Sequence, residues 1–84
     1  MHARAMVRLA EWSSITFGEH LKRTRHARGL TQEQAANLAG MHPANLRRIE
    51  RGAANPSLST MARLAVALEV NLADLVRGIP RQQD

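Results

Sequence analysis

Apolar residues recur at intervals of three and four along most of the chain, the spacing that places side chains on one face of an α-helix. The most regular stripe comprises Leu58, Met61, Leu64, Ala65 and Leu68. Capping and helix-ending residues divide the pattern into five segments, and none alternates as a β-strand does. The pattern therefore predicts an all-α fold with five helices.

The first helix is predicted from the pair Thr16 and Glu19, which has the spacing of a capping box. It should cover residues 17–28 and end at Gly29, because glycine readily adopts the left-handed conformation that closes a helix. Residues 1–14 show no firm periodicity, so we expect them to form a flexible N-terminal arm.

The second and third helices are short and close together in sequence. Thr31 with Gln34 forms another capping box, and Gly40 ends the helix that it opens. Its expected inward residues are Ala35, Leu38 and Ala39. After a turn in which His42 acts as cap, the third helix is predicted over 43–51, since proline suits a first helical position.

The fourth and fifth helices complete the predicted unit, which spans residues 15–79. Ser57 or Ser59 should cap the fourth helix, and Asn71 the fifth. We expect residues 80–84 to be a disordered tail.

Composition narrows the class of protein. The 84 residues contain no cysteine and only two aromatic residues, Trp12 and Phe17. This indicates one small domain in a reducing compartment, without disulfides or a thiolate metal site. No apolar run has the length of a membrane span or of a secretory signal, so a cytoplasmic protein is expected.

The net charge of +5 is concentrated in the middle of the chain. The segments before residue 20 and after residue 51 are neutral, whereas residues 20–51 hold seven basic and two acidic side chains. Such a concentration is typical of a polyanion-binding surface, although a solubilising charged face remains an alternative.

Enzymatic and metal-binding functions find no support in the spacing of polar residues. His20 and His26 are six residues apart, which is not the spacing of a helical ligand pair. The acidic residues are scattered, and no serine or threonine has a histidine and an acid arranged around it. We therefore expect a protein that is not an enzyme and has no cofactor, bound metal or evident small-molecule effector.

Two short helices joined by a glycine-containing turn match the helix-turn-helix unit, whose second helix enters the DNA major groove. The longer string LTQEQAANLAGMHPANLRRIERGAANPSLSTMARLAVALEVNLADLV resembles the helix-turn-helix domain of the lambda-repressor and Cro-like (XRE-type) regulators. The resemblance covers about residues 17–76. It implies a five-helix domain that binds double-stranded DNA and regulates transcription.

By position, the resemblance implies that the recognition helix reads bases through Pro43, Ala44, Arg47 and Arg48. Because proline and alanine cannot make bidentate hydrogen bonds to a base, direct readout should depend on the two arginines. The implied contacts to DNA phosphates come from Gln32, His42, Asn45 and Arg51. An alternative for Gln32 and His42 is that they only cap helices.

The resemblance also implies an ion pair between Arg25 and Glu50, which would remove one basic residue from the DNA surface. A homodimer is expected, because one recognition helix contacts few base pairs. The residues expected at its interface are Leu68, Val70, Leu72, Leu75, Val76 and Ile79.

Two narrower interpretations remain open. Controller proteins of restriction-modification systems resemble this chain in length and in the segment IERGAANPSLSTMARLAVAL. Alternatively, the chain is an antitoxin or other protein-interaction module with secondary DNA binding.

Overall fold

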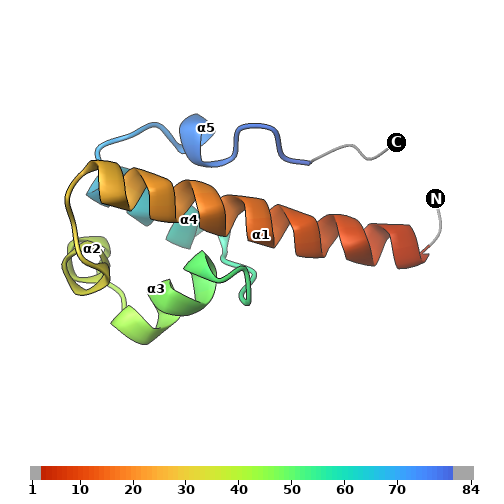
Figure 1. Cartoon of the computed structure of the whole chain (residues 1–84), viewed down its shortest axis with the longest axis horizontal. Coiled ribbons are helices and arrows are strands. Elements are labelled where there is room, and N and C mark those ends of the chain that lie inside the picture. Colours follow the sequence, from red (N-terminus) through yellow and green to blue (C-terminus); the bar gives the residue numbers. More distant parts are fainter. Residues whose placement is uncertain (1–2, 81–84) are drawn as a thin grey trace.

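The computed structural model describes residues 3–80, and the part that it describes contains five α-helices and no strand. They are α1 (Ala3–Ala27), α2 (Gln32–Ala39), α3 (Pro43–Glu50), α4 (Leu58–Ala67) and α5 (Leu72–Leu75). In Figure 1, α1 runs along the whole molecule, α2 and α3 lie on one side of it, α5 lies on the other, and α4 lies behind. The predicted all-α, five-helix fold is confirmed.

The start of α1 differs from the prediction. The helix begins at Ala3 and has 25 residues, so the segment expected to be a flexible arm is helical from residue 3 onward. Thr16 and Glu19 lie inside this helix and do not cap it. The segment before Thr16 is rich in Ala, Arg, Met and Leu, which favour helix, and contains neither glycine nor proline. Of the predicted tail, residues 81–84 lie outside the described part.

The N-terminal half of α1 extends beyond the other helices, as Figure 1 shows. This gives the molecule its elongated dimensions of 40 × 21 × 19 Å. None of the helices among residues 3–80 is both long enough and apolar enough to cross a membrane.

The core is built mainly from leucine and alanine. Its largest fully buried side chains are Leu21, Leu46, Leu64, Leu68 and Leu75. Alanines line the inner side of α2, where Ala35, Ala36 and Ala39 are buried. Small side chains there let α2 pack closely against its neighbours.

Two leucines predicted to face inward are exposed. Leu38 keeps 60% of its surface accessible and Leu58 keeps 68%. The buried positions of α2 are three alanines, so its inward face is rotated away from Leu38. Leu58 is the first residue of α4 and directly follows the Ser57 cap, so it lies at the end of the stripe that begins to pack at Met61.

Gly18 sets the distance between α1 and α3. A Cβ atom at this position would lie 2.4 Å from the carbonyl oxygen of Ile49 and 2.8 Å from that of Glu50. Only a residue without a side chain permits this approach of the two backbones. The C-terminal end of α3 is therefore held directly against α1.

The turn between α2 and α3 follows the predicted order of residues. Gly40 has φ 67°, in the left-handed region that glycine adopts without strain. The Met41 N–H donates to the Ala36 carbonyl oxygen over 2.9 Å, which closes the end of α2. The chain then enters α3 at Pro43.

Candidate nucleic-acid interface

The first turn of α3 is capped by a histidine. Nδ1 of His42 accepts a hydrogen bond from the Ala44 N–H over 3.1 Å, and Pro43 follows the cap. This satisfies one of the backbone donors that a helix start leaves unpaired. The cap predicted at His42 is confirmed.

The inner and outer faces of α3 are clearly separated. Leu46 and Ile49 are buried in the core, with exposed fractions of 0% and 4%. The helical repeat places Ala44, Arg47, Arg48 and Arg51 on the opposite side, where the three arginines are exposed and Ala44 is half-buried. Asn45 is exposed at one edge of this face, and Pro43 is half-buried at the other. The structure thus brings the predicted base-reading arginines onto one open face.

A buried carboxylate joins the three helices that form this region. Glu50 at the end of α3 accepts hydrogen bonds from Arg25 Nε over 2.6 Å and from Arg25 Nη2 over 2.9 Å. The side chain of Gln32 in α2 donates a further bond over 3.0 Å. Arg25 also donates to the carbonyl oxygen of Leu30 over 2.9 Å. The ion pair implied by the family resemblance is present, and it holds α3 at a defined angle to α1 and α2.

This arrangement gives Gln32 a structural partner in addition to its predicted contact with DNA. One N–H of its amide is directed at Glu50, while the side chain remains only half-buried. An amide group has a second N–H and a carbonyl oxygen. Gln32 can therefore anchor α2 to α3 and still present a donor at the start of α2.

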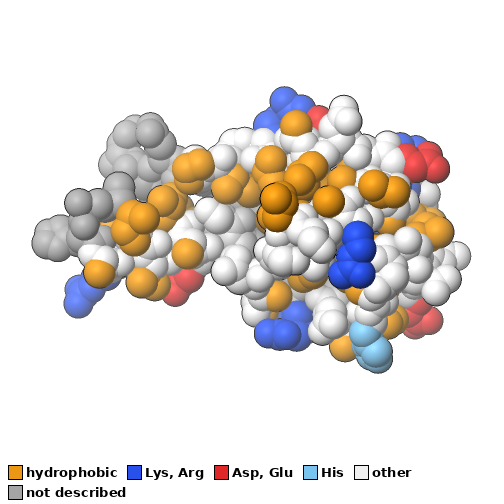
Figure 2. All heavy atoms as spheres, turned by 180° about the vertical axis from the view of Figure 1, so that it is seen from behind, with side chains coloured by type: hydrophobic (Ala, Val, Ile, Leu, Met, Phe, Trp, Pro, Cys, Tyr) orange, Lys and Arg blue, Asp and Glu red, His pale blue; other side chains and the backbone are white. Residues whose placement is uncertain are grey.

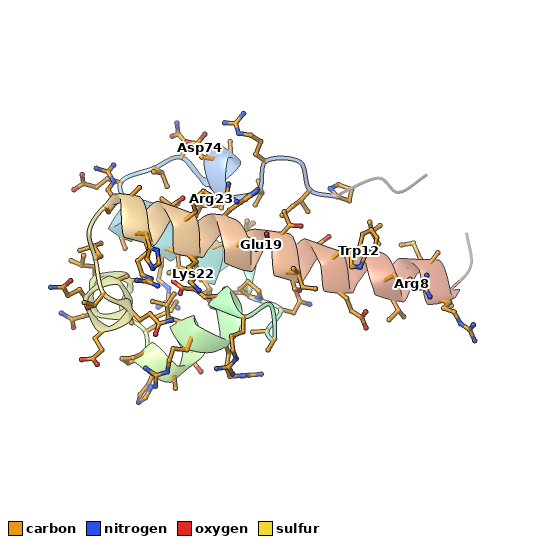
Figure 3. All side chains as sticks on the ribbon, in the orientation of Figure 1. Arg8, Trp12, Glu19, Lys22, Arg23 and Asp74 are labelled. Atoms are coloured by element: carbon orange, nitrogen blue, oxygen red, sulfur yellow. The ribbon has the colours of Figure 1, made fainter. Side chains whose placement is uncertain are left out.

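The basic residues of the middle segment have different surroundings. Arg25 is committed to Glu50, and Arg28 donates to the backbone carbonyl of Glu69 over 2.8 Å at the far end of α4. Figure 3 places Lys22 on the side of α1 toward α3, whereas Arg23 lies on the side toward α5. Lys22 is thus a candidate phosphate contact that its position in the sequence did not reveal.

The residues predicted at the dimer interface are shared with the core of the domain. Leu68 and Leu75 have exposed fractions of 1% and 0%, so both are used within the core of a single chain. The other predicted members are partly buried against that core: Val70, Leu72, Val76 and Ile79. The physical reason is that α5 packs on α1, where Nδ1 of His20 lies 3.0 Å from the carbonyl oxygen of Leu75. Leu68 and Leu75 therefore belong to the core, whereas the role of the four partly buried residues in a dimer stays a prediction.

Known proteins share this arrangement. A family model described as a helix-turn-helix domain matches residues 16–77. The immunity repressor protein of Bacillus phage phi105 is 40% identical over 62 residues, which are 74% of this chain and 43% of that protein. The control protein C.SmaI of Serratia marcescens is 33% identical over 67 residues, covering 77% of this chain and 80% of the relative.

A solved structure gives the same result at the level of the fold. The restriction-modification controller protein C.AhdI of Aeromonas hydrophila is similar with a TM-score of 0.73 and 37% identity, over 74% of this chain and 94% of that one. The matched region contains all the residues of the α3 surface described above. The chain spans less than half the length of the phage repressor.

Proposed function

Because this chain belongs to the lambda-repressor and Cro-like family of helix-turn-helix regulators, we propose that it inserts α3 into the major groove of an operator as a homodimer. Members of the family are DNA-binding regulators of transcription, and this chain shares that general function. The finer proposal concerns which residues read the sequence and which hold the backbone.

The observation that carries the proposal is the open face of α3. Arg47 and Arg48 are exposed on a helix whose opposite side packs in the core through Leu46 and Ile49. Arginine can donate two parallel hydrogen bonds to O6 and N7 of guanine, and each such contact contributes about 1–3 kcal/mol of discrimination. Ala44 adds a small apolar surface that suits a thymine methyl group.

Contacts to phosphates should orient the protein without selecting a sequence. The residues that we assign to these contacts are Gln32 at the start of α2 and His42, Asn45 and Arg51 in or beside α3, and we add Lys22 of α1 to this group. The positive end of the α2 dipole lies at Gln32 and favours a nearby anion. These residues supply affinity that falls steeply as the salt concentration rises.

The decisive experiment is selection of bound sites from random duplex DNA by the native protein and by three variants. Arg47→Ala and Arg48→Ala should relax the preference at one or two base positions each. Gln32→Ala should weaken binding to all sequences by a similar factor. Unchanged preference in both arginine variants would place base recognition elsewhere and refute this assignment.

A narrower role follows from two of the relatives. One is titled a restriction-modification controller protein and another a control protein. We propose that this chain has the same kind of role and binds DNA upstream of a neighbouring methyltransferase or endonuclease gene. A footprint of the protein on the DNA around its own gene tests this, and protection confined to unrelated loci would contradict it.

A further inference from the structure

The projecting half of α1 has an apolar face that no described part of the chain covers. Val7 is 56% exposed and Met6 is 49% exposed. Ala3 and Ala10, which share this face, are exposed as well. An isolated helix segment of this length is only marginally stable in water, so a covering surface would stabilise it.

The same face continues into the core without interruption. Positions 3, 7, 10, 14, 17 and 21 are separated alternately by four and three residues, which is the spacing of a helix-pairing seam. Phe17 and Leu21, at the inner end of this seam, pack inside the domain with exposed fractions of 3% and 1%. The outer end of the seam has the spacing of a helix-pairing surface, but no described helix packs against it.

Charges along one edge of this seam are complementary. Arg4 and Glu11 are seven residues apart and lie on the same side of the seam. Within residues 3–80, neither of them forms an ion pair. Figure 2 shows hydrophobic side chains gathered on the projecting part of the molecule, with basic and acidic side chains at its edge.

We infer that the projecting half of α1 pairs antiparallel with the same segment of a second copy of this chain. A two-fold axis near residues 7 and 8 brings Arg4 of each copy beside Glu11 of the other, so the contact satisfies both charges twice. Val7 then packs close to its own equivalent. The inference deepens the proposed homodimer by placing its interface on α1.

A parallel pair would lack this complementarity. It would place each edge of the seam against the opposite edge of the partner helix, so Arg4 and Glu11 would not face each other. The antiparallel arrangement also directs the two domains to opposite ends of the paired segment. About three turns of helix on each side give an interface near the lower limit of roughly 1,000 Å² for specific contacts, so we expect dissociation in the micromolar range.

The other exposed apolar region is less suited to a second copy. A shallow hollow between α2 and α4 is lined by Leu38, Ala62, Val66 and Arg63. Its only charged lining residue is basic, so two copies of this surface would bring arginines together. Val66 is 78% exposed and provides a matched control for Val7.

The first test is sedimentation equilibrium of the full chain over a range of concentrations. We expect a monomer–dimer equilibrium that Val7→Glu weakens at least tenfold, whereas Val66→Glu leaves it within twofold. Circular dichroism of both variants establishes that they are folded. A dimer that survives Val7→Glu, or that only Val66→Glu dissociates, overturns the inference.

The second test uses charge reversal, which does not depend on burial. Arg4→Glu places an acidic residue in the first turn of α1 and four residues before Arg8, and both changes favour the isolated helix. Even so, we expect it to weaken the dimer about fivefold, because it sets glutamate against glutamate across two symmetric contacts. The double variant Arg4→Glu with Glu11→Arg should restore association to within twofold. Failure of this restoration refutes the proposed register.

Direction of pairing is tested by oxidation of single-cysteine variants, since the native chain has no cysteine. Val7→Cys should give a disulfide-linked dimer. Ala3→Cys should not, because the antiparallel register separates position 3 from its equivalent by about 13 Å along the axis. Ready cross-linking of Ala3→Cys would indicate a parallel pair. These readouts need no DNA, so sequence-specific binding by a strictly monomeric chain would refute this interface while leaving base recognition by α3 intact.

Discussion

The side-chain nitrogen of Gln32 lies 3.0 Å from a carboxylate oxygen of Glu50, so the first residue of α2 is hydrogen-bonded to the last residue of α3. Replacement of Gln32 by alanine should therefore lower the free energy of unfolding by about 1–3 kcal/mol, because a bond to a buried charge is lost. Urea denaturation measures the change. Asn37→Ala, on the exposed side of the same helix, is the control and should have little effect.

Arg25 makes a larger contribution to the same network. Arg25→Ala should destabilise the fold by about 3–5 kcal/mol, since it leaves the carboxylate of Glu50 buried with one donor. The double variant Arg25→Met with Glu50→Leu should lose much less than the sum of the single changes, because no charge remains buried. Additive losses in urea denaturation would show that the two residues are not coupled.

Gly18→Ala tests the close contact between α1 and α3. In the interior of an exposed helix this change usually adds about 1 kcal/mol of stability. Here the new methyl group would meet the Ile49 carbonyl oxygen at 2.4 Å, so we expect a loss of about 1–3 kcal/mol from forced separation of the helices. Ala27→Gly, at the exposed end of the same helix, measures the effect of glycine at a position without such a close contact. Stabilisation of the chain by Gly18→Ala would contradict the packing.

Glu69 occupies a backbone conformation that glycine normally holds. It has φ 58° after the end of α4, where a side chain costs about 1 kcal/mol relative to glycine. Glu69→Gly should therefore raise the free energy of unfolding by about that amount. The bond from Arg28 to the backbone carbonyl does not require the side chain and should persist. Thermal unfolding compares this variant with Glu69→Ala, which keeps the strain and should not be stabilised.

His42 contributes to stability through its cap on α3. His42→Ala should cost about 1 kcal/mol, and His42→Asn should recover most of it, because asparagine is a favourable N-cap. If His42 also contacts a phosphate, both variants should bind duplex DNA more weakly at equal folded fraction. Binding measured by fluorescence anisotropy of labelled DNA separates these two roles.

Much of the fold could be predicted because several local signals act within a few residues. Thr31 and Gln34 form the expected capping box, and Ser57 caps α4 through the Thr60 N–H. The ion pair of Arg25 with Glu50 came from resemblance alone, since 25 residues separate the partners in sequence. Its third donor, Gln32, could not be predicted, because which side-chain N–H faces a carboxylate depends on the angle between helices.

The errors have a common physical origin. Thr16 and Glu19 have the spacing of a cap, but such a pair cannot stop a helix when the preceding residues also favour one. The apolar positions of α4 and α5 suggested a surface, and two of them, Leu68 and Leu75, are buried in the core of the single chain. Periodicity shows which residues share a face but does not show what that face contacts. The sequence shows Gly18 only as a glycine inside a helical pattern, which does not reveal its close contact with the backbone of α3.

The extension of α1 beyond the domain also determines which part of this protein intrinsic fluorescence can monitor. Trp12 is the single tryptophan, there is no tyrosine, and Figure 3 shows it on the outlying part of that helix. Tryptophan fluorescence therefore depends on the surroundings of this segment and does not report on the core or on α3. An emission change that precedes the loss of ellipticity on heating would record fraying of the projecting half of α1 while the remaining helices are still folded.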